Sequence, residues 1–287
     1  MTDYSDSRRR REQHREGDRN RRPGSRPPLQ VFTTTLWEYP SQHFDSPDGT
    51  AMQGDKSYVG ATPSWLIWQL LTRYTREKDL IVDPMCGSGT TMDVARGLQR
   101  RALGYDLAPT RDDIFRADAR KLPLEPGTAD FAFVDPPYST HVDYSDDPRC
   151  IGKLDAGGDD GGQAYYTAMT GVIRELHRVL RPQRYMALYV SDSWRKRKGD
   201  ESAGSWSAGK GKQPPSPAAK AHATKGGIFM PIGFELFSIM RTMFTPVDII
   251  AVVRHNEKLK RGNWHKAAEE GNFFLRGFNY LFVMKKE

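Results

Sequence analysis

The stretch LIVDPMCGSGTTMDVARGL, residues 80–98, joins a short apolar run, a glycine-rich turn and the start of a helical pattern. Gly87 and Gly89 follow the apolar run, and Thr90 and Thr91 stand where the helical pattern begins. Glycines allow a ligand to approach the backbone closely, and the free N–H groups of a helix start favour polar or anionic groups. The turn is neither GxGxxG nor a Walker loop, so it indicates a ligand site only in combination with other features.

Similar units recur along the chain. Apolar runs predict strands at 80–84, 101–106, 113–118, 129–135, 185–192, 248–255 and 278–286. Helical patterns fall at 63–74, 89–100, 164–180 and 233–244. Strands that alternate with helices indicate a mostly parallel sheet with helices on both faces. No helical pattern separates the last two strands, so we expect seven strands with the last one antiparallel.

Composition narrows the class of protein. The chain has 287 residues, 37% of them hydrophobic, and a formal net charge of +7. This charge favours an acidic partner such as nucleic acid, although a solvated basic surface would give the same value. The two cysteines form no CxxC or Cys/His cluster, which argues against a disulfide framework or a structural metal and fits a reducing cytoplasm. No apolar run has the length of a membrane span, and no signal peptide is visible.

Two polar stretches interrupt the pattern. Residues 1–30 are rich in arginine and poor in large apolar side chains, so we expect a disordered basic arm. The arm would either grip phosphates or act as a solubilising tail. Residues 195–227 are rich in Lys, Gly, Ser and Pro, which predicts a mobile loop within one domain over 31–287.

Four successive predicted strands end in an aspartate, at Asp83, Asp106, Asp118 and Asp135. Any one of them alone is more simply a strand-end or helix-capping residue. The carboxyl ends of parallel strands meet at one edge of the sheet, where open α/β sheets bind ligands. Four acids in succession therefore indicate a site, with Asp106 placed to hydrogen-bond ribose hydroxyls.

The fourth of these strands is followed by two prolines and a tyrosine, in ADFAFVDPPYST at residues 129–140. Proline has no N–H and cannot continue a central ladder, so the strand must stop at Asp135. The Asp135 carboxylate, the rigid backbone of Pro136 and Pro137 and the Tyr138 ring should then lie together at the edge of the sheet. In isolation these four residues are equally compatible with a simple turn.

DPMCGSGTT at 83–91, followed by DPPY at 135–138, resembles the S-adenosylmethionine-dependent amino-methyltransferases, chiefly the DNA adenine-N6 and cytosine-N4 enzymes. RELHRVLRP at 174–182 is similar to a helix that many of these enzymes carry before the fifth strand. The resemblance covers nearly everything from Phe32 to the C-terminus. It implies a Rossmann-like class I methyltransferase fold and S-adenosylmethionine as the cofactor.

The resemblance also implies a cofactor site. Asp83 and the glycines would hold the methionine part, Asp106 the ribose and Asp118 the adenine, while GATPSWLIW at 60–68 would close over the methionine carboxylate. The full set of implied cofactor residues is Thr62, Asp83, Pro84, Cys86, Gly87, Ser88, Gly89, Thr90, Thr91, Asp106, Asp118 and Ala119. Two features depart from the family. LAPTRDD at 107–113 leaves little room for the usual helix, and the cofactor motif precedes DPPY, so the target-recognition region cannot be placed by analogy.

At the second motif the implied catalytic residues are Asp135, Pro136, Pro137 and Tyr138. An exocyclic amino group is a poor nucleophile because its lone pair is delocalised into the ring. Asp135 and the Pro136 carbonyl would each accept one N–H, which positions the amine without a covalent intermediate. Tyr138 would stack on an extruded base, so a duplex substrate implies base flipping.

We therefore expect DNA adenine-N6 methylation. Cytosine-N4 relatives more often carry serine in place of Asp135, which favours adenine. Cytosine-N4 methylation, RNA methylation at adenine-N6 or guanine-N2, and an inactive nucleic-acid-binding methyltransferase fold remain open, as does a restriction-modification partner. The acidic stretch 139–162 should form a lid or a wall of the base pocket. The expected substrate-binding residues are Tyr138, Ser139, Arg254, Asn256, Lys260, Arg261, Asn263, Trp264 and His265.

Overall fold

A computed structural model of the chain describes residues 27–45, 53–55, 58, 60–142, 144–196, 227–255 and 262–287. Most of the expected basic arm and most of the expected mobile loop therefore lie outside the described residues. Residues 27–30, assigned to the arm from sequence, contact the folded body. Leu29 packs against a buried apolar cluster, and the Gln30 carbonyl accepts a hydrogen bond of 2.6 Å from Gln69 Nε2.

The centre of the fold is a mixed eight-stranded sheet in the order β1-β9-β10-β6-β5-β2-β3-β4. β10 is antiparallel to both of its neighbours, and every other adjacent pair is parallel. The strands are β1 (Leu36–Trp37), β2 (Leu80–Asp83), β3 (Arg101–Asp106), β4 (Ile114–Arg116), β5 (Ala129–Val134), β6 (Leu180–Val190), β9 (Thr245–Val253) and β10 (Phe278–Lys285). This is an α/β Rossmann-like sheet.

The seven strands expected from sequence are present, and the last is the antiparallel one. The expected total of seven needs correction, because β1 adds an eighth strand beside β9. A separate antiparallel ribbon also forms from β7 (Ser193–Lys196) and β8 (Gly227–Met230). Residues 195, 196 and 227 thus belong to strands instead of the expected loop. Both additions are short, and their pairing depends on neighbours that local patterning does not reveal.

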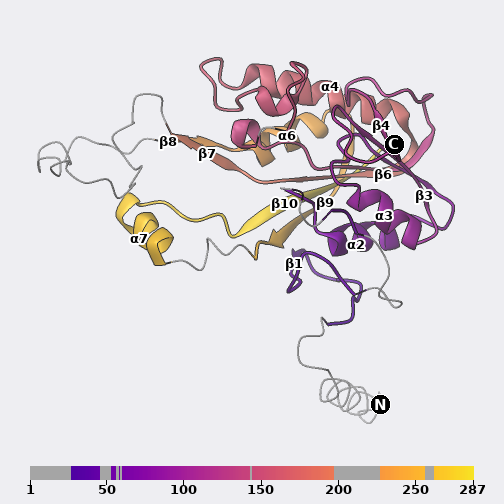
Figure 1. Cartoon of the computed structure of the whole chain (residues 1–287), viewed down its shortest axis with the longest axis horizontal. Helices are drawn as coiled ribbons and strands as arrows, with labels where there is room; N and C mark the ends of the chain where they lie inside the picture. The colour runs from indigo at the N-terminus through magenta and orange to yellow at the C-terminus, as the bar shows by residue number, and fades with distance from the viewer. Residues whose placement is uncertain are drawn as a thin grey trace, which may run out of the picture.

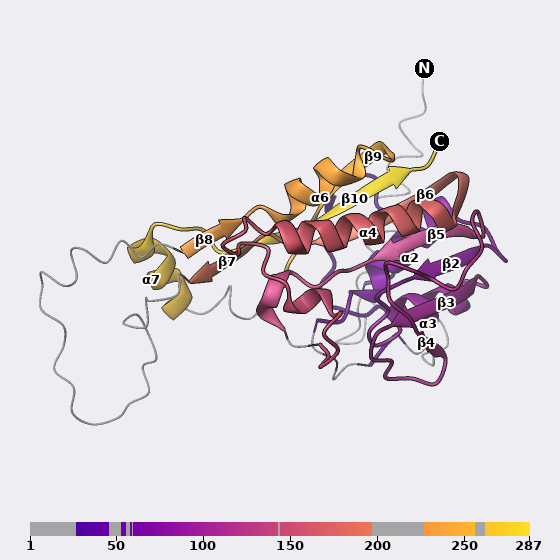
Figure 2. The same cartoon turned by 90° about the horizontal axis from the view of Figure 1, so that it is seen from above.

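Helices cover both faces of the sheet. α2 (Ser64–Tyr74) and α3 (Thr90–Gly97) lie on one face, and α4 (Gln163–Val179) and α6 (Ile232–Met240) lie on the other (Figures 1 and 2). Short 3₁₀ turns, η1 (Ser139–His141) and η2 (Ile151–Lys153), follow β5. A further helix, α7 (Gly262–Gly271), lies between β9 and β10, where the sequence analysis expected no helix.

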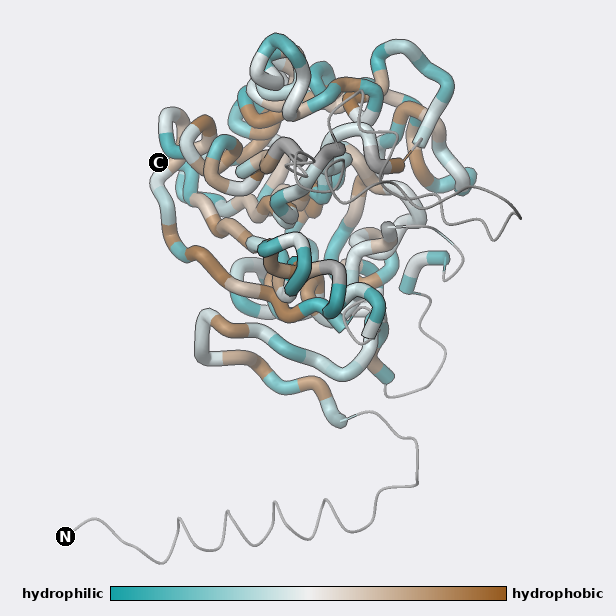
Figure 3. Tube along the Cα trace, turned by 90° about the vertical axis from the view of Figure 1, so that its left-hand side faces the viewer, coloured by the Kyte–Doolittle hydropathy of each residue, from teal (hydrophilic) through white to brown (hydrophobic). Residues whose placement is uncertain are grey.

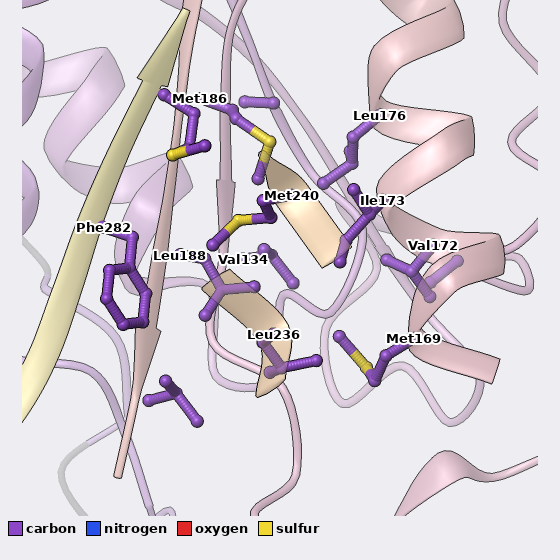
Figure 4. Packing of buried hydrophobic residues seen from close by; sticks show 14 of the residues in the cluster. Val134, Met169, Val172, Ile173, Leu176, Met186, Leu188, Leu236, Met240 and Phe282 are labelled. Atoms are coloured by element: carbon purple, nitrogen blue, oxygen red, sulfur yellow. The ribbon is translucent and has the colours of Figure 1, made fainter. Parts of the chain in front are cut away.

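Spacing of apolar residues explains how α4 attaches to the sheet. Its buried positions include Met169, Val172, Ile173 and Leu176, which recur every three or four residues and so share one face. Figure 4 shows these side chains facing the sheet together with residues of α6. Along the whole trace, hydrophobic stretches alternate with hydrophilic ones, as layered α/β packing requires (Figure 3).

β5 is buried on both sides, as expected for a central parallel strand. Phe131 and Phe133 pack with the cluster under α2, and Ala132 and Val134 pack with the cluster under α4. The strand order reverses between β2 and β5, so the crevice beyond their carboxyl ends is the topological switch point of the sheet. The motif after β2 and the motif after β5 both open into this crevice.

Candidate active site

A cavity of about 610 Å³ lies at this edge of the sheet. Its volume is in the range of small-molecule and cofactor sites. Four parts of the chain form its walls, namely the glycine turn after β2, the strand-end acids, the segment before α2, and the loop after β5. The cavity lining includes Thr62, Asp83, Pro84, Cys86, Gly87, Ser88, Thr90, Thr91, Asp106, Asp118, Ala119, Asp135, Pro137, Tyr138 and Arg254. The structure thus brings most of the residues expected from sequence together in one place.

The glycine turn is held open by its backbone conformation. Gly87 and Gly89 have φ of 50° and 84°, values that favour glycine. The Gly87 N–H donates a 3.0 Å hydrogen bond to Asp106 Oδ2, and Asp106 Oδ1 accepts the Ala108 N–H at 3.0 Å. Asp106 therefore fixes the turn and the start of the following loop while its side chain lines the cavity. Gly89 does not line the cavity and instead packs against the Arg111 guanidinium.

The short loop between β3 and β4 contains no helix and is stabilised by the contacts of Arg111. Its guanidinium donates to both carboxylate oxygens of Asp93, at 2.8 Å each, and to the Ser88 carbonyl at 3.1 Å. It also contacts both oxygens of Asp113, whose pKa it lowers to about 2. Asp93 in turn accepts the Gly54 N–H at 2.9 Å. The short loop thus ties the first turn of α3 to the segment upstream of α2.

Asp83 lines the cavity as a buried carboxyl group. Its Oδ1 accepts the Met85 N–H at 3.1 Å. Burial raises its pKa to about 7, although hydrogen bonds from the Thr91 side chain and the Met85 backbone oppose the shift. A carboxylate kept in a low-dielectric pocket favours a cationic or hydrogen-bonding ligand, because such a ligand offsets the cost of burying the charge.

Asp135 lines the same cavity. Thr62 Oγ1 donates to its Oδ2 at 2.7 Å, and the Tyr138 hydroxyl donates to its Oδ1 at 2.8 Å. Burial raises its pKa to about 7, and the two hydroxyls partly oppose that shift. The two oxygens of an ionised carboxylate have about four lone-pair sites in total, so each oxygen of Asp135 keeps one acceptor position after these hydrogen bonds. The carboxylate is therefore oriented and still able to bind a donor.

The backbone of the DPPY motif is anchored from outside the cavity. Tyr165 on α4 donates its hydroxyl to the Pro137 carbonyl at 2.7 Å. Ser139 is fully buried and does not line the cavity, because its hydroxyl accepts the Ala156 N–H at 3.0 Å. Pro136, expected from sequence to be catalytic, is buried and is not among the residues that line the cavity. The motif thus places the Asp135 carboxylate, Pro137 and Tyr138 at the cavity.

Asp118 borders the cavity with its charge already paired. Both of its oxygens bind the Arg120 guanidinium, at 2.8 and 2.6 Å. Burial would raise the pKa of Asp118, but the hydrogen bonds from Arg120 outweigh this and lower it. Arg120 also donates to the Arg149 carbonyl at 3.0 Å, which attaches the loop after β5 to this end of the cavity. That loop supplies cavity walls, as expected for the stretch 139–162.

Besides Tyr138 and Ser139, the expected substrate-binding residues divide into three groups. Arg254 lines the cavity, and its Nη1 lies 3.5 Å from Ser191 Oγ. Asn263, Trp264 and His265 lie on α7, exposed and outside the cavity lining. The remaining three, Asn256, Lys260 and Arg261, lie outside the described residues.

The cavity residues missed by the sequence analysis include four with polar side chains, Tyr58, Tyr144, Tyr189 and Asn279. Burial is the main cause that raises the pKa of the Tyr144 hydroxyl to about 12, so this hydroxyl stays protonated at neutral pH. Tyr189 lies at the end of β6 and Asn279 at the start of β10, and no local motif marks them. Only the pairing of those strands brings them to the cavity.

A family model described as DNA methylase matches residues 2–116 of the chain. The match includes the glycine turn and Asp106 and ends before Asp135. No curated protein matches the sequence. Among the described residues, no helix has the length and apolar character to cross a membrane, and no cluster of potential metal ligands occurs.

Several solved structures are similar to this chain at low sequence identity. TrmN from Thermus thermophilus is 16% identical with a TM-score of 0.45, and the likeness covers 80% of this chain and 50% of that one. The chain thus spans about half the length of TrmN. Geranyl diphosphate C-methyltransferase from Streptomyces coelicolor, solved with S-adenosyl-L-homocysteine, is 14% identical with a TM-score of 0.43. The likeness covers 78% of this chain and 76% of that one. A SAM-dependent methyltransferase from Methanosarcina mazei is 13% identical with a TM-score of 0.41. The likeness covers 76% of this chain and 96% of that one.

Proposed function

We propose that the chain is a DNA amino-methyltransferase that transfers a methyl group to the N6 amino group of adenine in DNA, a proposal supported by the match of residues 2–116 to a family model described as DNA methylase. The observation that carries this proposal is the position of Asp135. Its carboxylate opens into the same cavity as the glycine turn and Asp106. The cofactor motif and the DPPY motif therefore face one ligand-sized space, as direct methyl transfer between two bound molecules requires.

S-adenosylmethionine is the methyl donor, and the cavity residues fit it. Gly87 provides the close backbone approach, with φ of 50°. Asp106 lines the cavity at the end of β3, where ribose hydroxyls are bound in folds of this type. Asp83 offers a buried carboxylate to the positively charged methionine part. When bound, the cofactor supplies an electrophilic methyl group on a sulfonium.

The amine is handled by residues of this chain. Asp135 accepts one N–H of the exocyclic amino group and, as the resemblance of the motif implies, the Pro136 carbonyl accepts the other, which favours a pyramidal nitrogen with its lone pair directed at the methyl. Thr62 and Tyr138 keep the carboxylate in one orientation. As the nitrogen attacks, positive charge develops on it and the nearby carboxylate stabilises that charge. A pKa near 7 also suits Asp135 to accept the proton that the nitrogen then loses.

Adenine is favoured over cytosine by the residue at position 135. A carboxylate offers negative charge to the attacking nitrogen, whereas the serine common in cytosine-N4 relatives offers only a neutral oxygen. The aromatic cavity residues Tyr138, Tyr144 and Tyr189 provide faces and edges for a flat heterocycle. A base inside a duplex cannot enter such a cavity, so flipping is part of the proposal.

The test is product analysis. The purified protein is incubated with methyl-labelled S-adenosylmethionine and with DNA or RNA, each single- and double-stranded, and nucleosides are then separated by mass spectrometry. We expect label in N6-methyl-2′-deoxyadenosine. Label in N4-methylcytosine, or in RNA alone, would replace the substrate assignment. Intact cofactor binding without any labelled nucleoside would contradict the enzymatic role, and Asp135→Asn serves as the inactive control.

A further inference from the structure

The cavity continues past Asp135 to the ends of β6, β10 and β9. β10 runs antiparallel to its neighbours, so its first residues meet the last residues of β6 and β9 at the same edge of the sheet. Tyr189 lies near the end of β6, Asn279 near the start of β10 and Arg254 directly after β9, and all three line the cavity. Asp106, which fits the cofactor ribose, lies after β3 on the other side of Asp135. The cavity therefore has a second part, which the cofactor assignment leaves unused.

The register of the strands places these side chains on one face of the sheet. Tyr189, Leu281 and Val252 pack in the same apolar cluster under α2. Successive residues of a strand point to opposite faces, so a residue two positions away shares the face. Asn279 stands two residues before Leu281, and Arg254 stands two residues after Val252. The second part of the cavity thus has Asn279 and Arg254 on the side of the sheet that α2 covers.

Asn279 carries an unpaired acceptor. Its side chain is 5% exposed, and its Oδ1 has no hydrogen-bond partner among the described residues. Burial raises the pKa of Tyr189, as does the nearby charge of Asp135, while Arg254 and a hydrogen bond from the Asn279 side chain oppose the rise. The amide is thus held at one end by Tyr189 and lacks a partner at the other. Buried polar atoms are almost always paired, so a ligand that donates to Oδ1 would account for this position.

Arg254 is a half-buried cation with little to bind. Its Nη1 lies 3.5 Å from Ser191 Oγ, and no carboxylate of the described residues forms an ion pair with it. Its charge acts on the Tyr138 hydroxyl as well as on Tyr189, so the guanidinium lies close to the DPPY motif. A guanidinium presents its N–H donors in a planar fork that matches the oxygens of a phosphate. An anionic group is therefore the ligand that charge favours at this end of the cavity.

We propose that the second part of the cavity holds the target nucleotide, with Asn279 bound to the edge of the base that carries the amino group and Arg254 bound to the phosphate. We call Tyr189, Asn279 and Arg254 the nucleotide subsite. The proposal rests on the proposed function, because it takes this amino group to be the one that is methylated. β10 lies two strand spacings from β5, or roughly 10 Å, so one flat heterocycle between them reaches both Asp135 and Asn279.

An asparagine side chain matches this edge of the base. Adenine offers an amino N–H beside a ring nitrogen, and the oxygen and nitrogen of a carboxamide pair with these two groups. Pro136 is buried and does not line the cavity, so Asn279 adds an acceptor for the amino group on the cavity side. Guanine and thymine have a carbonyl oxygen in this place, which would face Oδ1 with no hydrogen between them. The subsite thus selects amino-bearing bases, adenine and cytosine.

Binding of small nucleotides tests these contacts separately from catalysis. The full chain is saturated with S-adenosylhomocysteine, which fills the cofactor part of the cavity. Binding of deoxyadenosine monophosphate is then followed by NMR titration. Two further ligands each lack one group, namely the same monophosphate without the amino group and deoxyadenosine without the phosphate. Wild type should bind the complete nucleotide more tightly than either of them.

Asn279→Leu should weaken binding of deoxyadenosine monophosphate about tenfold or more, because the contact to the amino group is lost. Binding of the analogue without the amino group should change little. A merely structural role would weaken both ligands equally. Leu has nearly the volume of Asn and removes the unpaired acceptor, so Tm should not fall. Exposed Asn263 on α7 provides the matched control, since Asn263→Leu should bind both ligands as wild type.

Arg254→Gln should remove the advantage that the phosphate gives. We expect wild type to prefer the monophosphate over deoxyadenosine about tenfold or more, as a charge-assisted contact allows, and the variant to bind the two ligands alike. Its affinity for deoxyadenosine should remain that of wild type. Exposed Arg174 on α4 is the control of equal charge, and Arg174→Gln should keep the preference for the monophosphate.

The outcomes separate the nucleotide subsite from the function itself. A wild-type preference for the amino group in Asn279→Leu, or for the phosphate in Arg254→Gln, overturns the proposal, and adenine methylation by wild type then leaves the function intact. The expected pattern of binding, with no methylated nucleoside in any nucleic acid, supports the subsite and contradicts the function. Failure of the wild-type complex to bind deoxyadenosine monophosphate overturns the subsite.

Discussion

Thr62 and Asp135 are 73 residues apart in sequence and share a 2.7 Å hydrogen bond at the centre of the cavity. Thr62 belongs to the segment that enters α2, and Asp135 follows β5. The hydroxyl donates to one carboxylate oxygen, while Tyr138 donates to the other. This pair of bonds sets both the direction of the carboxylate and the pH at which it ionises, so Thr62 acts on the amine through Asp135.

Replacing Thr62 with Val should shift the pH dependence of methyl transfer. The Thr62 hydroxyl lowers the pKa of Asp135, which burial has raised to about 7. Without that hydroxyl the pKa rises further, so less carboxylate is ionised at neutral pH. The single-turnover rate should fall at pH 7 and recover at higher pH, and Thr62→Ser should restore the wild-type profile. A profile unchanged in Thr62→Val would contradict this positioning role.

Asp135→Asn should lower kcat while leaving cofactor and DNA affinity nearly unchanged. The amide keeps the shape of the side chain and loses the charge that stabilises the attacking nitrogen. By analogy with removal of one preorganised electrostatic contact, the decrease should be about 100-fold or more. Single-turnover methylation measures it, with cofactor binding in parallel. Asp135→Ser should retain partial activity, and a wild-type rate in Asp135→Asn would remove the catalytic assignment.

The same Asn variant should be more stable than wild type at alkaline pH. The pKa of Asp135 is raised from 3.8 to about 7 in the folded protein. The contribution of Asp135 to folding stability is therefore complete below about pH 4 and is lost as the pH rises through 7, where the buried carboxyl group ionises. Asn does not ionise, so the variant does not carry the cost of burying a charge. The gain in Tm should be larger at pH 8 than at pH 5, with 1 kcal/mol corresponding to roughly 2–4 °C in a chain of this size. Equal gains at both pH values would show that burial does not control this ionisation.

Asp106→Ala should weaken cofactor binding. It removes a charged acceptor for the ribose and also the acceptor of the Gly87 N–H, so the turn loses its anchor. The loss of a charge-assisted hydrogen bond costs about 1.5–3 kcal/mol, or about 10- to 150-fold in Kd. Calorimetry with S-adenosylhomocysteine measures it. Exposed Asp112, in the same loop, provides the matched control, since Asp112→Ala should bind as wild type. Equal affinity in Asp106→Ala would refute the ribose role.

Arg111→Met should destabilise the fold. Arg111 and Asp93 have side-chain exposures of 17% and 6%, so the variant leaves a mostly buried carboxylate without its cation. Removing one partner of a buried pair costs about 3–5 kcal/mol. Urea unfolding measures the loss, and Arg111→Met combined with Asp93→Asn should recover part of it. Arg96→Gln breaks a more exposed pair with Asp113 and should cost less than about 1 kcal/mol.

Much of the fold follows from local pattern. Each central strand is a continuous apolar run, and each helix shows apolar residues at helical spacing, because both elements must bury one or two faces. The strand ends are marked as well, since Pro84 and Pro136 cannot continue a ladder and the glycines permit the turn at 87–89. These features were sufficient to predict the α/β class, the antiparallel last strand and the location of the two motifs at one edge of the sheet.

Tertiary structure decided the features that depend on contacts between distant segments. The two-residue strand β1, the ribbon partners Trp194 and Phe229, and the cavity residue Asn279 carry no local signal of their own. Asp118 and Ser139 look like site residues in sequence, yet their polar atoms bind Arg120 and the loop at Ala156.

The physical reason for this division is the range of the interactions. Backbone hydrogen bonding and apolar periodicity act over a few residues, so sequence alone determined which elements form and which acids stand at their ends. The orientation of a carboxylate and its pKa depend on donors and burial supplied by remote parts of the chain. Only the folded chain could therefore place Thr62 beside Asp135, Arg111 beside Asp93 and Asn279 at the cavity.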